Sequence, residues 1–130
     1  MKRLLLLIVV SALLGGCVHL RRAAGPLRLG ASDSGRSVEM SVGQTLTVRL
    51  ASNPSTGHQW QVTTEPDARV LIVVDSGYDR PQSNALGAAG QAWWRLRATG
   101  AGSTSIALRY VRPWEPAPDA ERFTLTVTVK

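Results

Sequence analysis

The segment Arg122–Val129 reads RFTLTVTV and decides the fold class. Its apolar residues, Phe123, Leu125, Val127 and Val129, alternate with polar residues along the whole segment. Because successive side chains of a β-strand point to opposite faces, this period of two places all four apolar side chains on one face. The segment therefore predicts a strand that is buried on one side and exposed to solvent on the other.

The same alternation recurs upstream, in residues 44–50 and 104–111. Weaker or differently patterned runs bring the total to about seven strands, and they lie at 37–42, 59–64, 69–75 and 92–98. No segment of this part of the chain shows a convincing helical period. Short strands separated by Gly, Pro, Asn and Ser predict an all-β, immunoglobulin-like sandwich of two antiparallel sheets. A closed barrel is the alternative.

Three connections between these strands are longer than a turn requires. They follow the second, fourth and sixth expected strands and span residues 52–58, 76–91 and 112–120. If successive strands alternate in direction, connections after even-numbered strands all emerge at one end of the sandwich. Such loops often carry function, as the recognition loops of antibody domains do.

The first long connection contains Asn53-Pro54-Ser55-Thr56-Gly57. Pro54 fixes its own φ and pushes Asn53 toward extended geometry, while Gly57 can adopt a positive φ. These constraints predict a stiff, sharp turn that presents two small hydroxyl side chains. Such a turn could enter a narrow cleft.

The second long connection contains Leu86-Gly87-Ala88-Ala89-Gly90. Nearly every side chain here is small, so the backbone N–H and C=O groups are expected to lie open for pairing with another chain. A merely flexible linker is the alternative interpretation.

The third long connection contains Arg112-Pro113-Trp114-Glu115-Pro116. A tryptophan between two prolines on a polar loop is not expected to be a core residue. Exposed Trp beside Arg is the composition of an interaction hot spot.

Together these motifs resemble those of the chagasin family of cysteine-peptidase inhibitors. The NPTTG motif of that family is similar to residues 53–57, which Trp60 follows. Its GxGG motif is similar to residues 86–90. Its RPW motif, with flanks, is similar to residues 109–114 and 121–124. The resemblance covers most of residues 37–130. Ser55 replaces the usual Thr of the first motif, and Ala89 replaces the first paired Gly of the second.

The resemblance implies reversible blockade of papain-like cysteine peptidases by three loops that fill the substrate cleft. Thr56 would lie over the catalytic Cys and His of the peptidase, and the second loop would pair by its backbone with the non-primed side of the cleft. Trp114 would pack on the primed side, with Arg112 adding polar contacts. Trp60 lies in a strand run, where we expect it to belong to the core rather than to the binding surface.

The N-terminus predicts export. Lys2 and Arg3 precede an apolar run from residue 4 to residue 14 that is interrupted only by Ser11. This run is shorter than the about 20 residues that a membrane-spanning helix needs, so residues 1–16 are interpreted as a signal peptide. The tetrapeptide that ends in Cys17 resembles the bacterial lipobox, which implies a lipid anchor on that cysteine. An ordinary signal peptide with an incidental cysteine is the alternative.

Val18, rather than Asp, follows the cysteine and favours outer-membrane sorting in a bacterial envelope. Residues 17–36 are polar, rich in Gly and Ala, and aperiodic, so we interpret them as the lipidated cysteine with a flexible tether, and residues 37–130 as the inhibitor domain. A first edge strand that contains Leu27 and Leu29 is the alternative for part of the tether.

Composition excludes several classes of site. With Cys17 as the only cysteine and with two histidines, neither a disulfide nor a zinc cluster is available, and no metal or cofactor is expected. Without Lys2 and Arg3 the chain has thirteen basic and nine acidic residues, but no aromatic nucleic-acid motif accompanies them, so nucleic acid is not an expected partner. The domain is expected to be monomeric.

Two other classes of function compete with inhibition. An enzyme would have to use Ser55 or Thr56 with His58 and a distant Asp, and no nucleophile elbow or phosphate loop supports this, so we expect no catalysis. A non-inhibitory envelope lipoprotein module that binds glycan or another envelope protein is the more serious alternative, because a sandwich alone names no function.

Overall fold

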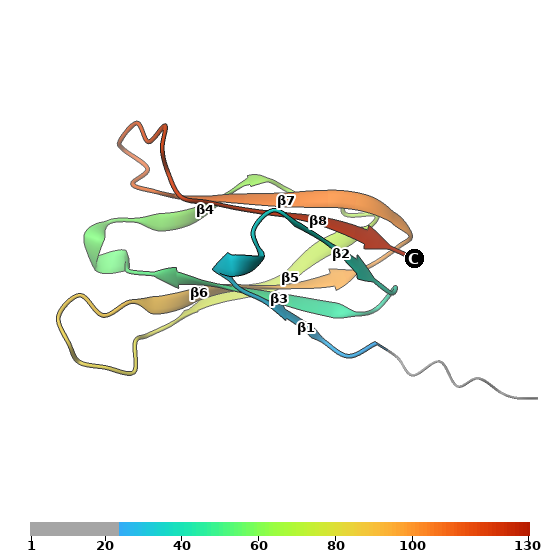
Figure 1. Ribbon diagram of the computed structural model, residues 1–130, viewed down its shortest axis with the longest axis horizontal. Helices are drawn as coiled ribbons and strands as arrows, with labels where there is room; N and C mark the ends of the chain where they lie inside the picture. Colours follow the sequence, from blue (N-terminus) through green and yellow to red (C-terminus); the bar gives the residue numbers. More distant parts are fainter. Residues whose placement is uncertain (1–23) are drawn as a thin grey trace, which may run out of the picture.

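The computed structural model describes residues 24–130, which form two four-stranded sheets packed face to face (Figure 1). The strands are β1 (Leu27–Leu29), β2 (Arg36–Met40), β3 (Thr45–Ser52), β4 (Gln59–Thr64), β5 (Leu71–Asp79), β6 (Gly90–Ala98), β7 (Gly102–Val111) and β8 (Arg122–Val129). One sheet has the order β1-β3-β6-β5 and the other the order β2-β8-β7-β4. The expected sandwich is confirmed, with eight strands instead of about seven, and the strands do not close into a single barrel.

The core comes from the three segments with the clearest alternation. Nine inward apolar residues of β3, β7 and β8 are at most 2% exposed, and they are Leu46, Val48, Leu50, Ile106, Leu108, Phe123, Leu125, Val127 and Val129. The other members of this buried cluster are Met40, Val70, Leu71, Leu96 and Ala98. Because the outward residues between them are mostly Thr and Arg, one face of each strand is dry and the other is solvated.

The structure corrects the assignment to a tether for residues 24–36, the described part of the range 17–36. Residues 27–29 form β1, which pairs in parallel with β3, and β2 begins at Arg36 and pairs in parallel with β8. Leu27 and Leu29 pack against the core, and Arg28 between them faces outward. The alternative of a first edge strand is therefore the observed one, and both sheets have a parallel edge pair beside their antiparallel strands.

Cys17 and the expected signal peptide lie outside the described residues. Within residues 24–130 there is no helix long and apolar enough to cross a membrane.

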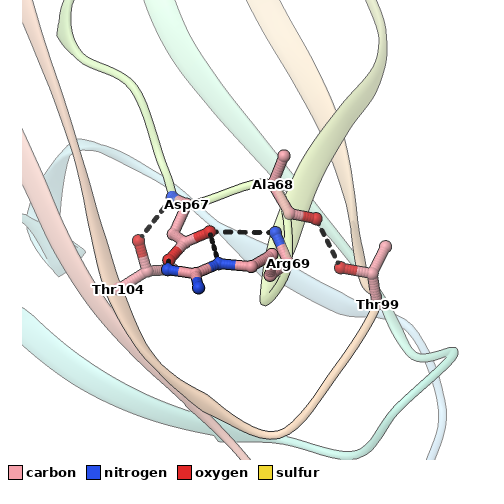
Figure 2. Close-up of polar contacts among 5 residues, drawn as sticks. All are labelled: Asp67, Ala68, Arg69, Thr99 and Thr104. Carbon is pink, nitrogen blue, oxygen red and sulfur yellow. Dashed lines mark hydrogen bonds and ion pairs between the residues drawn. The ribbon is translucent and has the colours of Figure 1, made fainter.

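The connection from β4 to β5 crosses between the sheets and is fixed by the network that Figure 2 shows. The Asp67 carboxylate accepts hydrogen bonds from the backbone N–H of Arg69 at 3.0 Å and from its guanidinium at 2.8 Å. The backbone N–H of Asp67 donates to the Thr104 hydroxyl at 2.8 Å, and the Thr99 hydroxyl donates to the carbonyl of Ala68. The side-chain hydrogen bond from Arg69, followed by the backbone one, holds the pKa of Asp67 below its ordinary value.

Candidate functional site

Three loops share one end of the sandwich, opposite the end at which the described chain begins (Figure 1). Loop 1 is residues 53–58 between β3 and β4, loop 2 is residues 80–89 between β5 and β6, and loop 3 is residues 112–121 between β7 and β8. Their expected clustering is confirmed. Loop 2 is shorter than expected, because β5 continues to Asp79 and β6 begins at Gly90.

Loop 1 is the stiff turn that its sequence predicts. Residues Pro54–Thr56 form a single 3-10 turn, in which the backbone N–H of Thr56 donates to the carbonyl of Asn53 at 3.2 Å. Gly57 ends the turn with φ 81° and ψ −4°, a left-handed conformation that side chains disfavour. The glycine of the motif therefore has a direct conformational reason.

Side chains of loop 1 close on the loop itself. The Ser55 hydroxyl donates to Oδ1 of Asn53 at 2.5 Å, and the Thr56 hydroxyl donates to the carbonyl of Asn53 at 2.8 Å. Oγ1 of Thr56 also lies 3.0 Å from Nδ1 of His58. Because a hydroxyl has one hydrogen and Thr56 uses it on Asn53, this contact places the imidazole hydrogen on Nδ1. Ser55 and Thr56 remain exposed at the tip.

Tyr110 of β7 supports loop 1, a role that the sequence did not predict. Its hydroxyl accepts a hydrogen bond from the backbone N–H of Asn53 at 2.8 Å. Its ring stacks on His58 and on Trp60, with centroid separations of 5.2 and 5.1 Å. The alternation of the strand placed Tyr110 on the inward face, but nothing in the sequence indicated its contact with a residue 57 positions earlier.

Trp60 is a supporting residue, as expected. It packs against the core, and its indole N–H donates to the carbonyl of Ala51 at 3.0 Å. The ring is half-buried rather than fully enclosed. Trp94 also packs against the core, whereas Trp93 lies on the outward side of β6.

Loop 3 begins with a tight turn that displays Trp114. The backbone N–H of Glu115 donates to the carbonyl of Arg112 at 3.1 Å, which puts Pro113 at the second position of the turn, where its fixed φ fits. Trp114 is 68% exposed. The expectation that this tryptophan lies outside the core is confirmed.

Loops 1 and 3 are in direct contact. Nε of Arg112 donates to the carbonyl of Thr56 at 2.9 Å, and the indole of Trp114 lies against the backbone of Gly57. The same guanidinium lies 3.6 Å from the Glu115 carboxylate. The arginine of loop 3 thus fixes the tip of loop 1 relative to the tryptophan.

Loop 2 presents a turn whose apex is apolar. The backbone N–H of Ala88 donates to the carbonyl of Ala85 at 3.1 Å, and Gly87, at the third position, has φ 79°. Leu86 at the second position is fully exposed. A long hydrogen bond of 3.5 Å joins Nδ2 of Asn53 to the carbonyl of Gly87, so loop 2 lies beside loop 1.

Gly90 and Ala89 depart from the expected picture of an open glycine loop. Gly90 is buried at the start of β6, where a Cβ would collide with the carbonyl oxygen of Asp79 and the ring of Tyr78. Its backbone pairs with Ser52 within the sheet and is therefore not open along its whole length. Ala89 is exposed, and within residues 24–130 no residue other than glycine has a positive φ.

The geometry favours surface recognition over catalysis. The Thr56 hydroxyl is committed to a backbone carbonyl, and no carboxylate among residues 24–130 forms a hydrogen bond with His58. What the end of the sandwich offers instead is three neighbouring loops with exposed hydroxyl, leucine and tryptophan side chains.

Several known proteins are similar to this chain in sequence and in fold. Residues 39–129 match the family described as Chagasin family peptidase inhibitor I42. Chagasin from Trypanosoma cruzi is 34% identical over 96 residues, which cover 71% of this chain and 87% of chagasin. The crystal structure of the cysteine protease inhibitor EhICP2 from Entamoeba histolytica superposes with a TM-score of 0.67 at 21% identity, over 82% of this chain and 96% of that one. The structure of PbICP-C in complex with falcipain-2 gives a TM-score of 0.60 at 18% identity, over 82% and 92%.

The family model covers all strands from the end of β2 to β8 and all three loops. The matched family consists of peptidase inhibitors, so the expectation that the chain is not an enzyme is confirmed. This chain belongs to the chagasin family of peptidase inhibitors.

Proposed function

We propose that this protein is a reversible inhibitor of papain-like cysteine peptidases and that loops 1, 2 and 3 together enter the active-site cleft. The observation that carries the proposal is the joining of the three loops at one end. Arg112 and Trp114 of loop 3 contact loop 1, and Asn53 of loop 1 reaches loop 2. A surface that is already ordered before binding loses less conformational entropy when the complex forms.

Loop 1 supplies the central contact in this proposal. Thr56, exposed at the tip, lies over the catalytic Cys and His of the peptidase, and Asn53, Pro54, Ser55 and Gly57 hold it there. The internal hydrogen bonds of Asn53 with Ser55 and Thr56 support this role, because they keep the loop in a closed turn rather than in the extended form of a cleavable substrate.

Loops 2 and 3 bind on the two sides of loop 1. In loop 2, residues 86–89 pair through backbone groups with the non-primed side of the cleft, and the exposed Leu86 supplies an apolar side chain. Gly90 contributes by allowing β5 and β6 to approach closely at the base of the loop. On the primed side Trp114 packs as an aromatic anchor, and Pro113 and Arg112 fix its position.

Titration of papain with the purified chain carrying Cys17→Ser tests this proposal. Stoichiometric, reversible loss of peptidase activity is the expected result. If papain stayed active in an excess of the chain, the result would favour the non-inhibitory envelope module instead.

We also propose that the chain is a bacterial lipoprotein with its anchor on Cys17, exported by the signal peptide of residues 1–16 and sorted to the outer membrane. The lipobox-like sequence before Cys17 and Val18 after it support this proposal. The described chain enters the domain at the end opposite the three loops (Figure 1), which supports an arrangement in which the loops point away from an N-terminal anchor.

A further inference from the structure

The outer face of the β1-β3-β6-β5 sheet carries a basic hollow whose lining residues lie outside the three loops. The hollow has a volume of about 400 Å³ and is lined by Arg28, Thr47, Arg49, Asp79, Trp93 and Arg95. Its lining residues all belong to strands β1, β3, β5 and β6, whereas the three loops project from one end of the sandwich (Figure 1). We refer to it as the arginine hollow.

Strand register places two arginines on either side of a hydroxyl. Arg28 of β1 pairs with Thr47 of β3, and Thr47 pairs with Arg95 of β6. Since neighbouring strands lie about 4.8 Å apart, the side chains of Arg28 and Arg95 leave the sheet about 10 Å from each other, on either side of Thr47. Two positions further along β3, Arg49 stands opposite Trp93.

The groups in the hollow are held in place by their neighbours. The guanidinium carbon of Arg95 lies 5.6 Å from the centroid of the Trp93 ring, within the range of a cation–π contact. Trp93 in turn lies close against Gly77 of β5, where a Cβ would come within 2.7 Å of Cζ2 of the indole. Because Gly77 has no side chain, the indole of Trp93 can pack flat against the sheet. The indole in turn orients Arg95.

The positive charge of the hollow is only partly neutralised. Arg49 forms an ion pair with Asp79, with Nη2 2.5 Å from Oδ2. In the part of the chain that the structure describes, no carboxylate forms an ion pair with Arg28 or Arg95. Two guanidinium groups thus remain free to bind an anion at a concave surface.

We propose that the arginine hollow binds an oligosaccharide that carries acidic groups. Each free guanidinium can bind a sulfate, phosphate or carboxylate group through two parallel hydrogen bonds. Thr47 and Asp79 offer a hydroxyl and a carboxylate to sugar hydroxyls, and the half-buried Trp93 lines the hollow beside them.

The lining of the hollow disfavours a lipid surface. It contains no aliphatic side chain, whereas binding to a lipid surface normally depends on buried apolar side chains in addition to charge. Asp79 ends β5 directly before loop 2, whereas Arg28, Thr47 and Arg95 lie further from the three loops along their strands.

Direct binding measurements test this proposal, independently of peptidase inhibition. The purified chain carrying Cys17→Ser is titrated with a sulfated hexasaccharide from heparin, and with neutral maltohexaose, in a calorimeter at low and physiological salt. We expect the sulfated sugar to bind and maltohexaose to give no heat. The double variant Arg28→Gln/Arg95→Gln should bind the sulfated sugar at least about tenfold more weakly.

The matched control removes the same charge from the other sheet. Arg36→Gln/Arg122→Gln, on β2 and β8, should change the affinity by no more than about twofold. An equal loss in both double variants would overturn the proposal, because the effect would then come from net charge. It would also be overturned if phosphatidylglycerol vesicles or a single-stranded oligonucleotide bound to the hollow more tightly than the hexasaccharide.

Discussion

The indole of Trp114 lies so close to Gly57 that a Cβ on the glycine would come within 2.6 Å of Cη2 of the ring. Gly57 also has φ 81°, so the position excludes a side chain both by backbone conformation and by contact. The two residues are 57 positions apart in the sequence, and they join loop 1 to loop 3. Gly57 of the first motif therefore also helps to set the position of the Trp114 ring.

Gly57→Ala should weaken inhibition of papain as well as lower stability. The left-handed conformation costs an alanine about 1–2 kcal/mol, and the added methyl group displaces Trp114. Gly43→Ala is the matched control, because Gly43 has φ 87° but no atom within 4 Å of an added Cβ. Melting curves should show similar destabilisation in both variants, and only Gly57→Ala should raise the inhibition constant. Equal inhibition constants would mean that the contact does not matter for binding.

Ala89→Gly should leave the inhibition constant unchanged within about threefold, because Ala89 already has a negative φ and needs no glycine. The added backbone freedom should lower the free energy of unfolding by less than about 1 kcal/mol. Inhibition assays and denaturant titrations of the two proteins measure both quantities. A gain in affinity of more than about tenfold would show that loop 2 must reach a left-handed backbone at this position when it binds.

Cys17→Ser should release the exported protein from the membrane and leave its inhibitory activity intact. Fractionation without detergent, followed by papain titration of the soluble fraction, checks both halves of this prediction. If the variant remained in the membrane pellet as firmly as the wild type, the lipid anchor would be wrong.

Asp67→Asn should lower the melting temperature at neutral pH and lose this effect in acid. The folded-state pKa of Asp67 lies below its ordinary value of 3.8, chiefly because Arg69 donates to the carboxylate. A lowered pKa stabilises the folded state above the unfolded pKa, and this stabilisation is lost as the pH falls through the folded pKa. Melting curves from about pH 7 to about pH 2 should therefore converge for wild type and variant.

Asp119→Asn is the control for that series, since Asp119 forms no ion pair with any residue of the described range 24–130. Its melting temperature should follow the wild type at every pH. A gap between wild type and Asp67→Asn that stayed constant with pH would contradict the role given to the carboxylate.

Sequence alone predicted the strands that bury one complete face. The alternation in β3, β7 and β8 exists because every second side chain must enter the core, and that requirement is visible locally. Strand β1 is harder to predict, because its three residues are too few to show an alternating pattern and its parallel pairing with β3 is not visible in the local sequence. Loop 2 was predicted too long because most of β5 is exposed, so the burial that produces alternation is missing there.

The contacts that organise the site could not be predicted in the same way. Motif order and strand direction were enough to bring three loops to one end. The hydrogen bond from Arg112 to Thr56 and the support of Asn53 by Tyr110 join residues more than fifty positions apart. Such contacts depend on side-chain directions in the assembled sandwich, which no local pattern records.

Trp60→Ala supplies the reference for the central claim, because this ring supports the fold and stacks on Tyr110. Removing a fully buried tryptophan costs about 3–5 kcal/mol of folding stability. Because Trp60 is half-buried, we expect its loss to lie near the lower end of this range. The correctly folded fraction should keep most of its affinity for papain.

The inhibition constant of Trp114→Ala against papain, measured beside its melting temperature, tests the account most directly. An aromatic anchor of this kind contributes about 2–4 kcal/mol to binding, so the variant should inhibit roughly thirtyfold to a thousandfold more weakly. Its melting temperature should hardly change, because the ring is 68% exposed. A Trp114→Ala variant that still inhibits as well as the wild type, whether or not its melting temperature falls, would contradict the insertion of loop 3 into the peptidase cleft.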